Sequence, residues 1–323
     1  MGSRRGSWHS RLLREPATTS PSSRCATRAE AVTQGSDGSG LLAGRYRVGK
    51  VIGRGGMSTV FAGHDMQSHA RNGAPREVAL KVMRTSAAAP DFARLLQLEA
   101  RRLIDLTHPN IVRVHNSHCH GPFQLMVMER LRGVTLADVV RTRDFAGLPL
   151  RLAFTLMREI GAGLQHAHDR GLVHADLKPG NVFIATEGQA KLLDFGTAHA
   201  LADPGRRLSD DDSELAIERV GALTPAYASP ERLAGASPGE VDDIFSLGVI
   251  TYIVMTGRHP FDRKPAIKAR EELLEPAPIA GLSRRRWNVM RAGLAFDAAE
   301  RPTSVADFVA GVAGEGLLDA WLG

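Results

Sequence analysis

The hydrophobic pattern of the chain changes once, near residue 130, and this change limits the folds that are open to it. Between Tyr46 and Glu129 the apolar residues form short runs separated by turn residues: YRVGKVIG, TVFAGHD, EVALKVM, NIVRVHNS and QLMVME. Such runs are typical of antiparallel strands. After Val134 the apolar residues recur at helical spacing. The chain is therefore predicted to be α+β, with a small sheet domain followed by a larger, mainly helical domain.

One helix is predicted within the sheet region and four are predicted after it. From Asp91 to Leu106, apolar residues recur at spacings of three and four, and Glu99 shares their face. The later region contains one amphipathic segment, one segment that is apolar nearly all round, and two shorter periodic segments. These four predicted helices are Arg151–Arg170, Val241–Met255 and the segments after Ser283 and Thr303.

Length, charge and cysteine content narrow the class of protein. The 323 residues can form about two domains. A formal net charge of +6 would permit nucleic-acid binding, but no basic stripe is interleaved with aromatic residues, so we exclude nucleic acid as a partner. Cys25 and Cys119 lie far apart, which fits a reducing compartment. Since Ile244–Met255 is shorter than the roughly 20 residues that cross a bilayer, we expect a cytoplasmic protein without a membrane span.

Composition divides the chain into four regions. Residues 1–44 are rich in Ser, Arg, Thr, Ala and Gly, and their few apolar residues cannot offset the entropy of ordering. We therefore predict a disordered tail at 1–44, a first domain at 45–131, a second domain at 132–313 and a short tail at 314–323. An Arg-rich, acid-poor start is also typical of an organelle transit peptide, or of a start codon placed too early.

Two polar segments of the sheet region are predicted to be connections without a catalytic role. Asp65–Arg76 is polar and is predicted to be a loop between two strands. His115, His118, Cys119 and His120 are metal-ligand types, but neighbouring residues on a strand or turn point in different directions. We therefore predict a hairpin connection there rather than a metal site.

A glycine-rich turn is predicted between the first two strands, with the sequence Gly53-Arg54-Gly55-Gly56-Met57-Ser58-Thr59-Val60. The backbone N–H groups of such a turn can approach phosphate oxygens closely. The same composition also suits a tight hairpin with positive φ. In the next strand, Lys81 is predicted to pair with Glu99. This pair could place the ammonium group on nucleotide phosphates, or it could be a surface pair worth less than about 1 kcal/mol.

The strongest local signal lies between residues 174 and 196. It consists of His174-Ala175-Asp176-Leu177-Lys178-Pro179-Gly180-Asn181, a short predicted strand at Val182–Ala185, and Lys191-Leu192-Leu193-Asp194-Phe195-Gly196. Phosphoryl transfer to a hydroxyl needs a carboxylate that accepts or orients the proton, oxygen ligands for Mg²⁺, and a cation near the moving group. This stretch supplies all three kinds of group.

On these motifs, residues 45 to about 313 resemble the eukaryotic-like (Hanks-type) serine/threonine protein kinases, in the form that is common in bacteria. The resemblance implies a bilobal fold with ATP between the lobes. It implies transfer of the γ-phosphate to serine or threonine hydroxyls of proteins, including those of the kinase itself. It also implies catalytic roles for Asp176 as base or orienter, for Lys178, and for Lys81 braced by Glu99.

The same resemblance implies the other site residues. Asn181 and Asp194 would hold Mg²⁺, for which Mn²⁺ is an alternative, and Thr224 would line the site of the substrate hydroxyl. ATP would be bound by Gly53, Arg54, Gly55, Gly56, Ser58, Val60, Ala79, Lys81, Met128, Glu129 and Leu131. Structural roles would fall to Glu231 and Arg301 as an ion pair, and to Asp243 as an anchor of the catalytic loop.

The chain departs from the family at Ala175, because an arginine often precedes the catalytic aspartate. Without this guanidinium, a phosphate on the activation segment loses its clamp, so we expect activity that does not require phosphorylation there. The acidic run Asp210-Asp211-Asp212 could replace the phosphate, or it could simply be solvated surface.

Two other functions remain as alternatives. A pseudokinase would keep the fold without turnover, although Lys81, Asp176, Asn181 and Asp194 are all present. A small-molecule phosphotransferase is suggested by the alanine before the aspartate and is opposed by the segment Thr224–Glu231. Because the chain ends soon after its last predicted helix, we expect its regulatory input to come from a separate protein.

Overall fold

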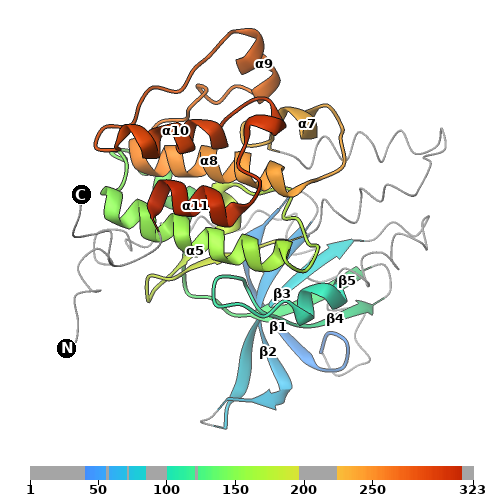
Figure 1. The fold of residues 1–323 in the computed structure, drawn as a ribbon. Coiled ribbons are helices and arrows are strands. Elements are labelled where there is room, and N and C mark those ends of the chain that lie inside the picture. The colour runs from blue at the N-terminus through green and yellow to red at the C-terminus, as the bar shows by residue number, and fades with distance from the viewer. Residues whose placement is uncertain are drawn as a thin grey trace, which may run out of the picture. The chain divides into compact units, whose positions relative to one another are not determined.

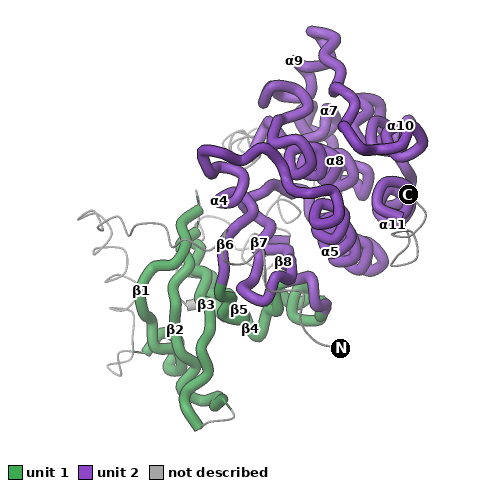
Figure 2. The backbone as a smooth tube through the Cα atoms, turned by 90° about the vertical axis from the view of Figure 1, so that its left-hand side faces the viewer, with its two compact units in different colours: residues 1–107, 112–132 green, residues 108–111, 133–323 purple. Residues whose placement is uncertain are grey.

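The structure, a computed structural model, describes residues 41–55, 58–70, 73–84, 100–120, 123–195 and 224–314. The chain divides into two compact units, Met1–Thr107 with Val112–Arg132, and His108–Ile111 with Gly133–Gly323 (Figure 2). The first unit, called the sheet unit below, contains a five-stranded sheet. The second, called the helical unit, contains most of the helices. The predicted α+β organisation, with a small sheet domain and a larger helical domain, is confirmed.

The sheet of the first unit is antiparallel and has the strand order β1-β2-β3-β5-β4. Each predicted run contributes one strand, although the fourth strand begins at Val114 rather than at Asn110. Residues 100–105 are helical, as predicted, while residues 91–99 of the same predicted helix lie outside the described residues. The strands are β1 (Tyr46–Arg54), β2 (Ser58–His69), β3 (Pro75–Arg84), β4 (Val114–His120) and β5 (Phe123–Glu129).

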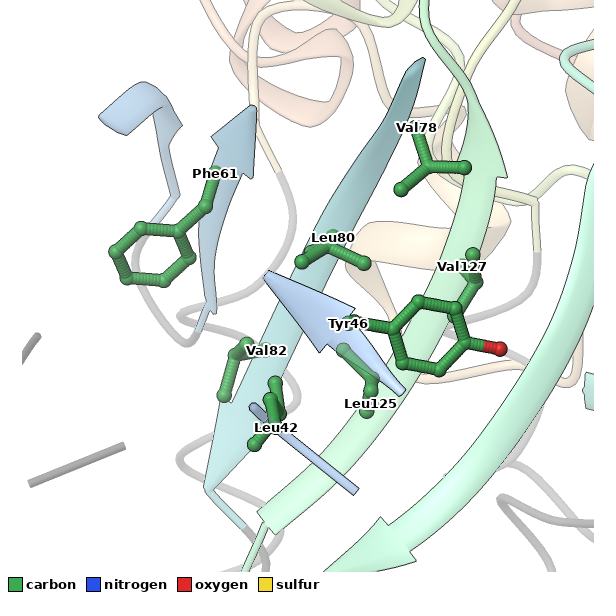
Figure 3. Close-up of a cluster of buried hydrophobic side chains, with 8 residues drawn as sticks. All are labelled: Leu42, Tyr46, Phe61, Val78, Leu80, Val82, Leu125 and Val127. Atoms are coloured by element: carbon green, nitrogen blue, oxygen red, sulfur yellow. The ribbon is translucent and has the colours of Figure 1, made fainter. Parts of the chain in front are cut away.

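The apolar core of this unit lies on one face of the sheet (Figure 3). Side chains alternate between the two faces of a strand, so Val78, Leu80 and Val82 of β3 share the core face. The buried cluster consists of Leu42, Tyr46, Phe61, Val78, Leu80, Val82, Leu125 and Val127. Lys81 therefore points to the opposite face, together with Ala79.

Two sequence predictions at the edges of this unit are wrong. The tail was predicted to reach residue 44, but Leu42 is only 2% exposed and its N–H donates to the Tyr46 carbonyl at 2.8 Å. The large apolar residues at this point are the adjacent Leu41 and Leu42, and two adjacent residues give no periodicity from which this burial could be predicted. Most of Asp65–Arg76 is strand rather than loop, because β2 continues to His69 and β3 begins at Pro75. Asp65 accepts two hydrogen bonds from the Arg45 guanidinium, at 2.7 and 2.6 Å, and this pair replaces apolar packing.

The histidine-rich segment is also placed differently from its prediction. His115, His118, Cys119 and His120 belong to β4 rather than to a hairpin connection. The His118 Nε2 lies 3.1 Å from the Tyr46 hydroxyl. Backbone pairing with β5 holds this polar strand in the sheet, although its sequence contains few of the apolar residues that normally mark a strand.

Four helices form the body of the second unit: α5 (Leu150–His168), α8 (Glu240–Thr256), α10 (Arg284–Gly293) and α11 (Val305–Ala313). They pack side by side, with α8 in contact with the other three (Figure 1). This explains why α8 is apolar on all sides, as predicted. Ser283 and Ser304 cap α10 and α11 by accepting backbone N–H groups.

Smaller elements complete the second unit. The strands β6 (Gly133–Thr135), β7 (Val182–Ala185) and β8 (Ala190–Leu192) form a three-stranded sheet. The short helices are α4 (Leu136–Val140), α7 (Pro230–Leu233) and α9 (Ala266–Glu271), with 3-10 turns at Pro179–Asn181 and Ala298–Glu300. Within the described ranges, none of the helices is both long enough and apolar enough to cross a membrane.

Candidate active site

The loop that carries the strongest motif, residues 174–181, is anchored by one buried carboxylate. Asp243 of α8 is 1% exposed and accepts the N–H groups of His174 at 2.8 Å and Ala175 at 2.9 Å. Its Oδ2 also lies 2.8 Å from the Nε2 of His168, at the end of α5. Ala175 has a φ of 63°, which is unfavourable for alanine, and the two N–H groups turned toward Asp243 hold it there. The contact that the family resemblance implies for Asp243 is therefore present.

Asp176 is held by two donors from its own loop. The Lys178 ammonium donates to its Oδ2 at 2.6 Å. The amide nitrogen of Asn181 donates to the Asp176 backbone oxygen at 2.8 Å and to Oδ2 at 3.2 Å. Among the described residues, both recorded donors to the side chain of Asp176 reach Oδ2. The carboxylate is thus fixed in orientation, and Oδ1 is the atom that could accept a proton from a hydroxyl.

The segment that ends at Phe195 is tied to the same loop. Leu193 donates its N–H to the Asn181 carbonyl at 2.8 Å, and its carbonyl lies 2.9 Å from the Nε2 of His174. The Phe195 ring packs on the His174 ring, with centroids 4.7 Å apart. Asp194, whose φ is 55°, sits between these two contacts. Sequence positions 176, 181 and 194 are therefore part of one connected structure.

The donor set of this loop fits a hard divalent cation. Because the amide nitrogen of Asn181 is engaged with Asp176, the atom that Asn181 can offer to a metal is its oxygen. Asp194 adds a carboxylate, and oxygen ligands are those that Mg²⁺ prefers. In the part of the chain that the structure describes, no group of three His, Cys, Asp or Glu side chains is placed to hold a metal. A cation here would need phosphate oxygens and water as further ligands.

The sheet unit brings four of the predicted nucleotide-binding side chains to a single face, whereas Glu129 lies opposite Val78 of the core face. Lys81 lies opposite Val60 of β2 in the register, and Ala79 lies opposite Met128 of β5. Directly opposed residues of a pleated sheet point to the same side. All four therefore occupy the face opposite the apolar cluster, and Lys81 is 3% exposed. Gly53 pairs with Val60 in β1 and β2, which adds the start of the glycine-rich turn to this set.

The glycine-rich turn does not use positive φ at the glycines that are described. Gly55 donates its N–H to the Ser58 carbonyl at 2.9 Å. Neither Gly53 nor Gly55 has a positive φ, and Gly56 lies outside the described residues. The conformation of this turn therefore does not by itself require glycine at positions 53 and 55.

The segment Thr224–Ser229 is fastened to the helical unit by three side chains. Ser246 of α8 donates to the Tyr227 carbonyl at 2.8 Å, and the Nε2 of His259 lies 2.8 Å from the Ala226 carbonyl. The Ser229 hydroxyl donates to the buried carboxylate of Asp242. Burial raises the pKa of Asp242, while this bond and the N–H of Gly239 oppose the increase.

Glu231 and Arg301 form the predicted ion pair. Both carboxylate oxygens of Glu231 lie 3.0 Å from Nη2 of Arg301, whose side chain is fully buried. The guanidinium also donates to the carbonyls of Ala295, Val241 and Phe296, and it lies over the Phe245 ring at 5.0 Å.

Comparison with known proteins identifies the family. The sequence model for the protein kinase domain matches residues 46–308. The chain belongs to the protein kinase family. Members of this family use ATP and a divalent metal ion. The bilobal kinase fold and the resemblance to bacterial serine/threonine kinases, both predicted from the sequence, are confirmed.

Named bacterial kinases share the domain. The kinase domain is 34% identical over 244 residues to serine/threonine-protein kinase PknB of Mycolicibacterium smegmatis, covering 73% of this chain and 37% of that protein. It is 36% identical over 228 residues to serine/threonine-protein kinase pkn2 of Myxococcus xanthus, covering 69% of this chain and 25% of that protein. The match thus spans well under half of each relative. The crystal structure of the Mycobacterium tuberculosis PknI kinase domain has the same fold, with a TM-score of 0.61 and 24% identity, covering 83% of this chain and 94% of that chain.

Some predicted kinase residues lie outside the described part, and some polar partners were not predicted at all. Glu99, and with it the proposed pair with Lys81, falls outside the described residues, as does the acidic run at 210–212. His168, Ser246 and His259 were missed. Ser246 could have been identified from the sequence, because it is a polar residue within a predicted buried helix. Such a residue has to find a hydrogen-bond partner.

Proposed function

We propose that the protein is an ATP- and Mg²⁺-dependent kinase that phosphorylates serine and threonine hydroxyls of proteins, including its own. The observation that carries the proposal is the fixed carboxylate of Asp176, held by Lys178 and Asn181 in a loop that Asp243 anchors. In this role Asp176 orients the acceptor hydroxyl and takes its proton, while Lys178 compensates charge on the moving phosphoryl group.

ATP would be bound by the face of the sheet that carries Val60, Ala79, Lys81 and Met128. The glycine-rich turn would cover the phosphates, and its glycines would serve close backbone approach, since turn conformation does not require them at 53 and 55. The Glu129 N–H already donates to the Arg113 carbonyl, and a Glu129 carboxylate oxygen accepts the Arg113 N–H, so adenine would have to be contacted by another group of this hinge segment.

Mg²⁺ would be held by Asn181 and Asp194, and it would neutralise charge on the phosphate oxygens. Thr224 would line the acceptor site, and Glu99 would brace Lys81. The cytoplasm is the proposed location, because Cys25 and Cys119 have no paired spacing in the sequence.

A small-molecule phosphotransferase and a pseudokinase are the rival functions. The three side chains that fasten Thr224–Ser229 favour a protein substrate, because they support a docking segment that a small alcohol would not need. Incorporation of labelled γ-phosphate, measured in parallel with a generic basic protein and with small alcohols, tests the proposal. Label on serine or threonine of protein supports it. Label on the alcohols alone, or nucleotide binding without any transfer, contradicts it.

Replacing Lys81 by methionine should lower the turnover number by about 10²- to 10³-fold, because a preorganised cation on the phosphates is lost. The fold should survive, since methionine fills nearly the same volume and the role proposed for Lys81 is phosphate positioning. Thermal unfolding and steady-state phosphorylation should be measured together, with Lys50→Met, an exposed lysine of β1, as the matched control. Equal activity of Lys81→Met and the control would rule out the assigned role.

A further inference from the structure

Among the side chains that fasten the proposed protein-docking segment, His259 has the ordinary pKa nearest to neutral pH. The segment Thr224–Ser229 is held by Ser246, by Asp242 and by His259. A serine hydroxyl does not titrate, and the ordinary pKa of an aspartate is about 3.9, although burial raises that of Asp242. Histidine ordinarily changes charge between about pH 5 and 8. His259 is therefore the contact whose ordinary titration range includes neutral pH.

The hydrogen bonds of His259 define its tautomer. The backbone N–H of Phe261 donates to Nδ1 at 3.1 Å, so Nδ1 is an acceptor and carries no proton. The proton of the neutral ring must then be on Nε2, which donates to the Ala226 carbonyl at 2.8 Å. The ring also contacts the Tyr227 ring edge-on, with centroids 5.8 Å apart. A neutral His259 satisfies both neighbours at once.

We propose that His259 is a positioning residue for the protein substrate, which holds Ala226 and Tyr227 in the docking conformation only while its ring is neutral. The proposal rests on the kinase function proposed above and adds a pH-dependent control of the same site. A second proton would have to enter at Nδ1, where it would face the N–H of Phe261 and break that hydrogen bond. The charged ring would still donate from Nε2 to Ala226, but it would have to shift to relieve the donor-to-donor encounter, and this shift would displace Ala226 and Tyr227.

The surroundings of His259 agree with this direction. Burial, the largest effect, lowers the pKa of His259 below the ordinary histidine value of 6.5. The Ala226 carbonyl and Asp262 raise this pKa, and the nearby Arg263 lowers it further. Tyr227, the other titratable group in contact, stays neutral because burial raises its pKa, although Arg263 and Arg141 oppose this.

The sign of the pH effect follows from the lowered pKa of His259. In the folded protein the ring protonates only when the pH falls through this lowered pKa, so the neutral contact is present at neutral pH and is lost at a pH below 6.5. The Michaelis constant for a protein substrate should therefore rise about fivefold between about pH 7.5 and pH 5, the effect of losing one hydrogen bond. The Michaelis constant for ATP should not follow the same curve, because ATP does not use this segment.

Steady-state phosphorylation of a generic basic protein over this pH range tests the inference with two variants. His259→Gln can still donate an amide N–H to Ala226 but cannot titrate, so its Michaelis constant for protein should stay low and flat. His259→Leu cannot donate, so its value should be raised at every pH. His64→Gln, an exposed histidine of β2, is the control and should keep the wild-type curve. A wild-type curve shared by His259→Leu would overturn the proposal.

A second measurement does not depend on catalysis. Hydrogen exchange of the amides in residues 224–229 should be faster in His259→Leu than in wild type or His259→Gln at neutral pH. Imidazole ¹⁵N shifts of the full chain should identify the Nε2–H tautomer for the signal that His259→Gln removes. If wild type transfers no phosphate, the kinase proposal fails, while these two readouts still judge His259. Unchanged exchange in His259→Leu, or an Nδ1–H tautomer, would refute the positioning role.

Discussion

Replacing Asp176 by asparagine should lower phosphoryl transfer by about 10²- to 10⁴-fold, the usual contribution of a positioned proton acceptor. The amide has nearly the same shape and can still accept a hydrogen bond from Lys178, so the loop should keep its conformation. What the variant loses is the basic oxygen that takes the hydroxyl proton. The loss should appear in the turnover number, and the Michaelis constant for ATP should change little, because Asp176 has no proposed contact with the nucleotide.

The control for this experiment is Asp144→Asn, which makes the same chemical change at an exposed position of the helical unit. Both variants should unfold at the wild-type temperature, since Asp243 anchors the loop backbone independently of the Asp176 side chain. Label that persists in Asp176→Asn preparations at the wild-type rate would show either that another group accepts the proton or that a contaminating kinase is present. Mass spectrometry of the phosphorylated residues in Lys81→Met distinguishes these two cases. This variant has a separate defect, so only a contaminating kinase would label it at the wild-type rate.

Segments with a regular hydrophobic period were predicted closely. The predicted helix Arg151–Arg170 is α5 at Leu150–His168, and the predicted Val241–Met255 is α8 at Glu240–Thr256. The strand Val182–Ala185 was predicted with its observed bounds. In each case the order of the apolar residues directly indicates whether one face or all faces of the element are buried.

Elements held by polar contacts could not be predicted in this way. The outer half of β2 is fixed by the ladder and by the pair of Asp65 with Arg45, neither of which leaves a hydrophobic period. For the site, the contiguous motif around Asp176 was visible, since its residues lie within one short stretch. The partners Ser246 and His259 were not, because each contacts a residue far away in the sequence and its role depends on the fold.

Replacing Glu231 by alanine should lower the free energy of unfolding by about 3 kcal/mol, at the lower end of the cost of breaking a buried ion pair. The guanidinium of Arg301 would remain, fully buried, without its carboxylate. Two features limit the loss. Glu231 is itself partly exposed, and Arg301 keeps its hydrogen bonds to the carbonyl groups of Ala295 and Val241. Chemical denaturation followed by circular dichroism measures the change.

Two companion variants separate the charge from other effects at this position. Glu300→Ala removes an exposed carboxylate from the residue next to Arg301 and should change stability by less than about 0.5 kcal/mol. Glu231→Gln keeps an acceptor oxygen without the charge, so its stability should fall between wild type and Glu231→Ala. If Glu231→Ala were as stable as Glu300→Ala, the three carbonyls and the Phe245 ring would be sufficient to hold the guanidinium. The ion pair would then orient the start of α7 rather than stabilise the helical unit.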